Sequence, residues 1–222
     1  MKILVFDDNQ AHRDAAKAQL AGHDLTVVGT YDQARDLVTS HLDYEKARRI
    51  LKDQFGDFNP WKSEDEEKKQ AYFAAQNAAN EVATTRPDFD AVLVDLLVPA
   101  SDDAQGPSGR KHVGTEMPVG SFIAFLAAKN GAKYAACFTD SSHHDHPAAA
   151  CFDAFNDDGG ESAPTPFTVN GCKVILSNTR NWVQKFDPSN LAKPLEYEEY
   201  SKRNDTVRAK NWAAVLDYLM NN

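Results

Sequence analysis

Short apolar runs alternate with helical patterns along most of this chain. Runs typical of buried parallel strands end in polar residues and cover residues 2–8, 25–29, 89–95, 134–140 and 173–177. Segments with the apolar spacing or capping signals of helices follow them, at residues 10–21, 31–55, 121–129, 141–155 and about 205–220. This five-fold β/α alternation predicts an α/β protein with a doubly wound, five-stranded parallel sheet.

A helical segment is inserted between the second and third predicted strands. The pattern of residues 31–55 breaks at 56–62, where the sequence is GDFNPWK. A second helical segment then runs to about Ala83, opened by a capping-box pattern of Ser63 and Glu66. We therefore expect an inserted helical hairpin near residues 41–86, between the second and third strands.

Two further insertions are predicted near residues 100–117, as a polar loop, and near 156–190, as a loop with a hairpin. Within the second, residues 182–186 are expected to pair with the strand at 173–177. The whole chain, 1–222, is predicted to be a single domain that ends after its last helix, with no output domain.

Composition narrows the functional classes. The chain has 222 residues, 42% hydrophobic and 26% charged, with a formal net charge of −9. Such a charge argues against a nucleic-acid partner, which needs clustered Lys and Arg. No apolar run approaches the roughly 20 residues of a membrane helix, and no signal peptide is recognisable. Cys137, Cys151 and Cys172 are odd in number and lack metal-ligand spacing, so reduced thiols and a cytoplasmic location are expected.

Carboxylates stand at the ends of two predicted strands. Asp7 and Asp8 end the first run, and Asp95 ends the third. Because ligands of open α/β sheets bind at the carboxyl ends of the strands, these three side chains are expected to converge there. Three adjacent carboxylates repel one another unless a cation neutralises them, and oxygen ligands suit Mg²⁺. The sequence therefore predicts a magnesium site.

Four short motifs in this order resemble those of the response-regulator receiver domain, a chemotaxis-type, flavodoxin-like family. They are the acidic pair Asp7–Asp8, the run Asp95–Pro99, the strand-ending Thr139, and Lys193–Pro194. The framework between them covers about two-thirds of the chain, and the three insertions make up most of the remainder. The resemblance implies the sheet order 2-1-3-4-5, numbered by the five predicted strands.

The resemblance also implies roles for residues. Asp95 is the implied phospho-acceptor, which would form an acyl phosphate. Asp7, Asp8 and Asp95 are the implied magnesium ligands, together with the backbone carbonyl of Leu97. The ion would offset the repulsion between an anionic nucleophile and an anionic phosphoryl group.

Two residues are implied to bind the phosphoryl group. Thr139 would donate a hydrogen bond, and this bond is the family's switch for the following loop. Lys193 would supply positive charge to the phosphoryl oxygens. Lys185 is the alternative to Lys193, because DPSNLAKPL around Lys193 lacks the apolar run of a strand.

Three positions depart from the family pattern. Asp140 stands where the family usually has a small residue, and its charge would repel an incoming phosphoryl group. Leu97 offers no polar side chain toward a hydrolytic water, so a phosphoryl group would persist. Asn190 stands three residues before Lys193, in place of the aromatic side chain that usually switches rotamer.

Other polar groups have simpler interpretations. A metal site in the SSHHDHP segment lacks a matching distant ligand pair, so a solvated first helical turn is favoured for its three histidines. These are His143, His144 and His146. The basic residues after Asp95 are expected in a solvated loop. These are Arg110, Lys111 and His112.

The resulting expectation is a stand-alone receiver that exchanges a phosphoryl group with a histidine kinase or a histidine phosphotransfer protein. Its output would pass through contacts with a further protein. A receiver fold that has lost phosphorylation and only binds partners is one alternative. Another is a magnesium-dependent phosphohydrolase similar to the haloacid dehalogenases, with Asp7 as nucleophile, although Asn9 replaces the second acid of that motif.

Overall fold

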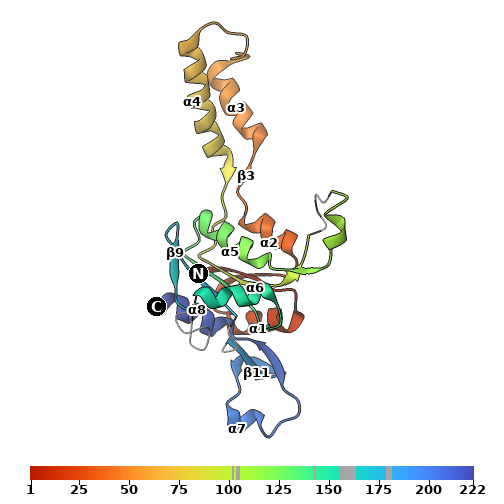
Figure 1. Ribbon diagram of the computed structural model, residues 1–222. Coiled ribbons are helices and arrows are strands. Elements are labelled where there is room, and N and C mark those ends of the chain that lie inside the picture. Colours follow the sequence, from red (N-terminus) through yellow and green to blue (C-terminus); the bar gives the residue numbers. More distant parts are fainter. Residues whose placement is uncertain (102, 104–105, 143, 156–163, 179–181) are drawn as a thin grey trace. The chain divides into compact units, whose positions relative to one another are not determined.

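The computed structural model describes residues 1–101, 103, 106–142, 144–155, 164–178 and 182–222. They belong to two compact units, both drawn in Figure 1. The α/β unit comprises Met1–Val38 and Asp88–Asn222, and the helical unit comprises Thr39–Pro87. No helix in these ranges is long and apolar enough to cross a bilayer.

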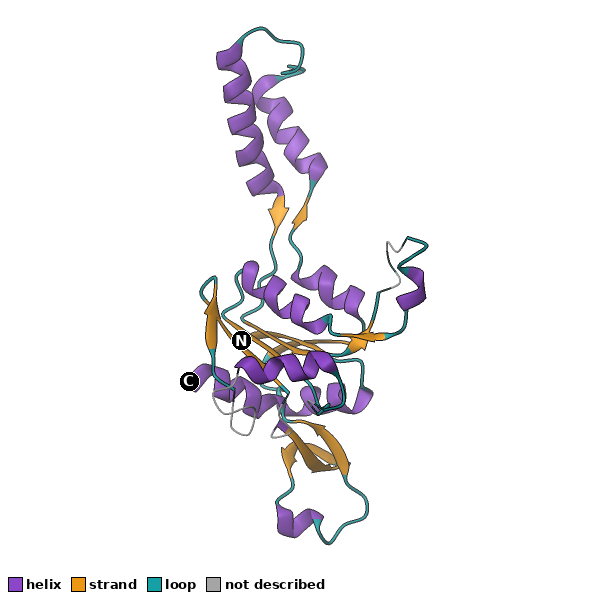
Figure 2. Ribbon diagram, in the orientation of Figure 1, coloured by secondary structure: helices purple, strands orange, loops and turns teal. Residues whose placement is uncertain are grey.

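A six-stranded sheet forms the centre of the α/β unit (Figure 2). Its strands are β1 (Lys2–Phe6), β2 (Asp24–Val28), β5 (Ala91–Asp95), β8 (Tyr134–Phe138), β9 (Phe167–Val169) and β10 (Cys172–Ser177). They lie in the order β2-β1-β5-β8-β10-β9, and every neighbouring pair is parallel except β10 with β9. The predicted α/β class with a mainly parallel sheet is confirmed. The antiparallel strand β9 was not predicted.

Helices cover both faces of this sheet. They are α1 (Gln10–Gln19), α2 (Tyr31–Val38), α5 (Gly120–Lys129), α6 (Pro147–Ala150) and α8 (Trp212–Asn221), with a 3-10 turn η2 (Cys151–Phe155). Leu4 and Phe6 belong to a core with α2 and α5. Ile3 and Val5, which alternate with them, belong to a second core with α1 and α8. Burial on both faces explains why the strands are apolar at every position rather than at alternate ones.

A separate three-stranded antiparallel sheet belongs to the same unit. Its strands are β11 (Val183–Asp187), β12 (Asn190–Pro194) and β13 (Val207–Lys210), in the order β12-β11-β13, and α7 (Tyr197–Tyr200) lies between β12 and β13 in the chain. The predicted pairing of residues 182–186 with 173–177 is therefore wrong. Strand β10 pairs instead with β8 and β9, so that no side of it is left for β11.

The segment between β5 and α5 contains two short strands, β6 (Val98–Pro99) and β7 (Glu116–Met117), and a 3-10 turn, η1 (Arg110–His112). Strands β6 and β7 pair with each other in an antiparallel arrangement. The loop predicted near residues 100–117 is thus closed at its base by a strand pair. The three cysteines are free, with Cys137 and Cys172 buried and Cys151 exposed.

The helical unit contains α3 (Tyr44–Phe55) and α4 (Glu66–Ala83), with strands β3 (His41–Leu42) and β4 (Thr84–Thr85) paired at its base. The helix predicted for residues 31–55 is in fact two helices, α2 and α3. Asp43 begins α3, because its carboxylate accepts a hydrogen bond from the Lys46 amide at 2.9 Å. The start of α4 was also mispredicted, since Asp65 is the cap rather than Ser63.

Candidate functional site

Strand β1 delivers two acids to the carboxyl edge of the main sheet. Asp7 follows β1 and is fully buried, and its Oδ1 accepts a hydrogen bond from the Asn9 amide at 2.9 Å. Asn9 in turn caps α1, so the turn that starts this helix also fixes the Asp7 carboxylate. The next residue, Asp8, is partly exposed.

Strand β5 lies beside β1 and supplies the third acid. Asp95 is its last residue, has only 6% of its surface exposed, and accepts a hydrogen bond from the Leu96 amide through Oδ1 at 2.8 Å. Carboxylate oxygens of Asp7, Asp8 and Asp95 lie within 4.8 Å of one another. The structure thus brings together the three acids that the sequence places at strand ends, here called the acid cluster.

A lysine that the sequence analysis missed completes this cluster. The Nζ atom of Lys210 lies 2.7 Å from Asp7 Oδ2 and 2.7 Å from Asp95 Oδ1, and its side chain is fully buried. The rings of Phe138 and Trp212 flank the ammonium, with centroids 5.1 and 5.4 Å away. Lys210 therefore provides the cation that two buried carboxylates need.

Lys193 and Lys185, the two lysines proposed from the sequence, lie elsewhere. Lys193 is exposed on β12, and Lys185 on β11 places its Nζ 4.4 Å from the ring centroid of Tyr200. Among the described ion pairs, Lys210 is the lysine that contacts Asp7 and Asp95. Lys210 ends β13 and precedes the α8 cap Asn211. The phosphoryl-binding role expected of Lys193 stays a prediction, although Lys193 is not among the described ion-pair partners of these two acids.

The cluster carries an excess of negative charge. Burial raises the pKa of Asp95 to about 7, against the opposing pull of Lys210. Burial and the neighbouring Asp7 also raise the pKa of Asp8. Burial alone would lower the pKa of Lys210, but Asp7 and Asp95 together raise it above its ordinary value. Asp95 thus resists ionisation, whereas Lys210 stays charged at neutral pH.

Thr139 and Asp140 follow β8 at the same edge. Asp95 is in register with Phe138, so the buried Thr139 comes directly after the residue beside Asp95. Its Oγ1 accepts a hydrogen bond from the Ser141 amide at 3.1 Å. Asp140 is partly exposed, and its Oδ2 lies 3.5 Å from Nε2 of His12 on α1. His12 is the main cause of a pKa of Asp140 that is lowered to about 2.

The other residues predicted from the sequence make no described contact with the acid cluster. Leu97 lies between β5 and β6 in the chain and is buried. The role of its carbonyl as a metal ligand stays a prediction. His146 caps α6 through Nδ1, and His144 is exposed, while His143 lies outside the described residues. The three basic residues of the loop after Asp95 are exposed in η1; they are Arg110, Lys111 and His112.

The chemistry of the acid cluster fits a hard divalent cation. Its donors are carboxylate oxygens, the ligands that Mg²⁺ prefers. When all three acids are ionised, Lys210 compensates only one of their charges. The carboxylate of Asp8 is partly exposed and available to an ion, whereas Oδ1 of Asp95 already contacts Leu96 and Lys210.

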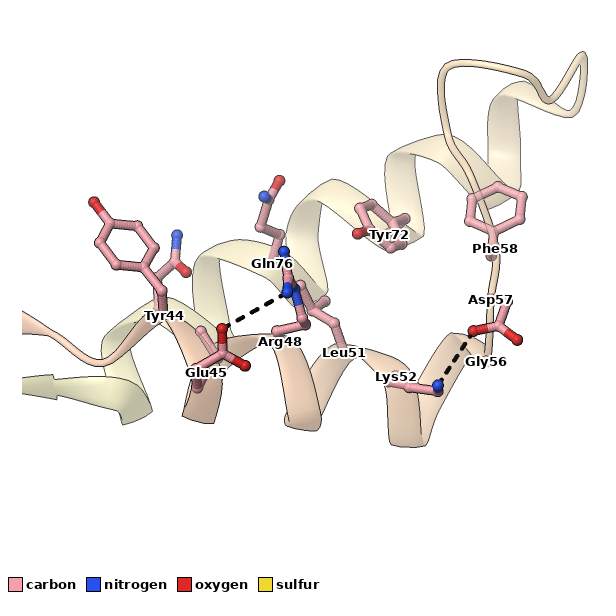
Figure 3. A pocket seen from close by; sticks show the side chains of 12 residues that line it. Tyr44, Glu45, Arg48, Leu51, Lys52, Gly56, Asp57, Phe58, Tyr72 and Gln76 are labelled. Atoms are coloured by element: carbon pink, nitrogen blue, oxygen red, sulfur yellow. Dashed lines mark ion pairs between the residues drawn. The ribbon is translucent and has the colours of Figure 1, made fainter.

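A groove of about 460 Å³ lies between α3 and α4 of the helical unit (Figure 3). Figure 3 shows two ion pairs on its α3 side, Arg48 with Glu45 at 3.6 Å and Lys52 with Asp57 at 3.4 Å. All four side chains are at least 67% exposed, so water weakens both pairs. The acid cluster, where charged groups are held out of water, is the stronger candidate for chemistry.

The raised pKa of Asp95 predicts how its removal affects stability. An acid whose pKa rises from 3.8 to about 7 on folding destabilises the fold above pH 7, and this cost vanishes as the pH falls below 3.8. Asp95→Asn should therefore raise the free energy of unfolding of the metal-free protein by on the order of 2 kcal/mol at pH 8 and by little at pH 4. Urea titrations at the two pH values measure this.

Asp90→Asn is the matched control. Lys133 lowers the pKa of Asp90, so this substitution should reduce stability at pH 8 instead of raising it. Equal effects of the two substitutions at both pH values would contradict the charge balance described for the acid cluster.

Comparisons of the chain with protein-family models, curated proteins and solved structures gave no match. Inferences about function therefore rest on the geometry of the acid cluster and on the sequence motifs that form it.

Proposed function

We propose that this protein is a receiver-type phospho-acceptor that takes up a phosphoryl group on Asp95 in two-component phosphorelay signalling. The observation that carries the proposal is the buried Lys210 ammonium, 2.7 Å from both Asp7 and Asp95. An ammonium in this position can bind the oxygens of a phosphoryl group that approaches Asp95. Lys210 thus takes the role that the resemblance to receivers assigned to Lys193.

In the proposed reaction, the ionised carboxylate of Asp95 attacks the phosphorus atom of the donor. A carboxylate oxygen–phosphorus bond forms, the bond from phosphorus to the leaving group breaks, and its electron pair departs with the leaving group. We assign the attack to Oδ2, because Oδ1 already contacts Leu96 and Lys210. The hydroxyl of Thr139 is the proposed hydrogen-bond donor to the transferred group. Its oxygen accepts from the Ser141 amide, which leaves the hydroxyl proton to donate.

Magnesium is the proposed cofactor, held by the carboxylates of Asp7, Asp8 and Asp95 and by the carbonyl of Leu97. When bound, it supplies positive charge that offsets repulsion between the carboxylates and the phosphoryl oxygens. The excess negative charge of the acid cluster supports this assignment, since Lys210 alone does not balance it.

The sheet supports a flavodoxin-like receiver topology as part of the proposal. Its parallel strands lie in the order β2-β1-β5-β8-β10, which corresponds to 2-1-3-4-5 when the shorter strands are left out of the count. Strand β9, the sheet of β11 to β13 and the helical unit are then additions to a receiver core. A phosphohistidine of a kinase or a phosphotransfer protein is the implied donor, and a cytoplasmic location follows from such a partner.

A phosphohydrolase with Asp7 as nucleophile is less well supported. Asp7 is fully buried, and its two carboxylate oxygens are engaged by the Asn9 amide and by Lys210. Attack by either oxygen of Asp7 would require the contact on that oxygen to be lost. Asp95 needs no such rearrangement.

Intact-mass measurement after incubation with magnesium and acetyl phosphate tests the proposal. The wild-type chain and Asp90→Asn should each gain one phosphoryl group, and Asp95→Asn should gain none. Steady release of phosphate without a phosphorylated chain would favour the phosphohydrolase. A chain that is never modified would contradict the proposal and favour a binding module.

Removal of Asp8 should weaken magnesium binding at least tenfold, because this side chain combines a free carboxylate with access to solvent. It should also raise the thermal stability of the metal-free protein, since the pKa of Asp8 shows that its charge is unfavourable there. Calorimetric titration of Asp8→Ala with magnesium measures the first effect. Asp88→Ala is the control, because Asp88 is exposed and pairs with Lys2; equal affinities of the two variants would rule out the assigned metal ligand.

A further inference from the structure

His12 is a buried histidine that the proposed phosphoryl transfer does not use. It lies on α1 with 3% of its surface exposed, and its carbonyl accepts a hydrogen bond from Trp212 Nε1 at 2.8 Å. Both nitrogens of its ring are buried, and within the described residues neither has a hydrogen-bond partner. Burial of unpaired polar atoms destabilises a fold, so packing alone does not account for a histidine here.

The acid nearest to this ring is Asp140. Its Oδ2 lies 3.5 Å from His12 Nε2, which is too long for a strong hydrogen bond but close enough for two opposite charges to attract. The Asp140 side chain is 42% exposed, so it can turn toward the ring or toward solvent. It follows Thr139, and its charge is felt by Asp95.

We infer that His12 is a positioning residue for the proposed phosphoryl site: its imidazolium draws the Asp140 carboxylate toward α1 and offsets its charge, which admits anionic phosphoryl donors to Asp95. The inference rests on the proposed function. With a neutral His12 the Asp140 charge is less compensated beside the site and slows phosphorylation. The Asp140 charge therefore slows phosphorylation only when His12 does not offset it. From the sequence alone, this repulsion was expected to be constant.

The charge of a histidine can depend on pH, so a comparison at two pH values tests the inference. Arg208 and Lys210 on β13 also lie close enough to act on Asp140. Other charged groups on the elements packed against α1 are Lys2 on β1, Asp7 directly after β1, Asp24 on β2, Lys193 on β12 and Asp217 on α8. None of these other groups is a histidine, so the inference concerns the charge of His12 alone.

The test compares phosphorylation rates by acetyl phosphate in wild type, His12→Gln, Asp140→Asn and the double variant, at pH 6 and pH 8. Because the Asp140 charge raises the pKa of Asp95, Asp140→Asn leaves more of Asp95 ionised, and this gain is larger at pH 6 than at pH 8. The gain therefore opposes the pH dependence expected from His12 and cannot imitate it. Asp140→Asn should be phosphorylated about three- to tenfold faster than wild type at pH 8 and by a smaller factor at pH 6. In the His12→Gln background the same substitution should accelerate the reaction at both pH values, and no longer more at pH 8 than at pH 6. In the Asp140→Asn background, His12→Gln should have no effect.

A pH-independent ratio in the wild-type background would overturn the inference while leaving the proposed function intact. If His12→Gln fails to fold, the ratio of wild type to the partly exposed variant Asp140→Asn still decides the question. Absence of phosphorylation in all variants would overturn the proposed function and, with it, this role of His12.

The contact itself can be tested without phosphorylation. Chemical shifts of the His12 ring nitrogens should move in Asp140→Asn and stay unchanged in Asp145→Asn, where an exposed acid of the same loop is neutralised. Unchanged chemical shifts of the His12 ring nitrogens in Asp140→Asn would show that the two side chains do not interact. This result would overturn the inference directly.

Discussion

Lys210→Met is expected to lower the free energy of unfolding by about 3–5 kcal/mol at pH 7.5 without magnesium. The side chain is fully buried between Asp7 and Asp95, so its loss leaves the acid cluster without a cation. The pKa of Lys210 is raised on folding, which means that its contribution is complete at all pH values below the ordinary 10.5 and is lost only above its raised value. Urea denaturation measures the effect, and magnesium should reverse part of it.

Lys193→Met is the matched control, because it removes the same charge from an exposed strand. It should change stability by no more than about 0.5 kcal/mol. The pair also separates the two lysines in function, since only Lys210→Met should impair phosphorylation by acetyl phosphate. Equal losses in the two variants would contradict the burial of Lys210 in the acid cluster.

Gly120→Ala is expected to destabilise the protein by about 3 kcal/mol or more. Gly120 is the first residue of α5, and its amide donates a hydrogen bond to the Leu96 carbonyl at 3.1 Å. A Cβ atom at this position would come within 1.7 Å of the Asp95 carbonyl oxygen, so α5 and the end of β5 would have to separate. Because this movement displaces Asp95, magnesium affinity should fall together with stability.

Gly22→Ala provides the control for Gly120→Ala. A Cβ atom at Gly22 meets nothing within 4 Å, and its backbone does not require glycine. Its stability should stay within about 1 kcal/mol of wild type and its magnesium affinity should not change. A Gly120→Ala protein that is as stable as Gly22→Ala would show that β5 and α5 are not in the contact described.

The main sheet was predictable because its strands are buried on both faces. Continuous apolar runs such as residues 3–6 leave few alternatives, and the acids that end them must lie at the sheet edge. Asp7, Asp8 and Asp95 could therefore be placed together from the sequence. Strand β9 could not, because its residues are at most half-buried and lack such a run.

Lys210 could not be found in this way. Strand β13 is only four residues long, and its sequence VRAK has no apolar run. Its ion pair with Asp7 spans 203 positions, and it depends on how the sheet of β11 to β13 returns the chain to the edge of β1. The Lys-Pro motif at Lys193 was a local signal, whereas the place of Lys210 is set by tertiary contacts. The same is true of His12, whose partner Asp140 follows a different strand.

The boundaries predicted for two helices were wrong for local reasons. Asp43 and Asp65 are the caps that begin α3 and α4, but other polar residues nearby, including Ser63, offered equally good capping patterns. Hydrophobic spacing continues across residues 39–43, which hid the end of α2. Competition between neighbouring caps is a general limit of such predictions.

The central claim is that the Asp95 carboxylate accepts the phosphoryl group, and locating the modified residue tests it most directly. Borohydride reduces an aspartyl phosphate to homoserine, so peptide mass spectrometry of the reduced protein identifies the acceptor. After treatment with magnesium and acetyl phosphate, the account predicts homoserine at position 95 and at no other aspartate. Homoserine at position 7, or a phosphoryl group found on a histidine instead, would contradict it.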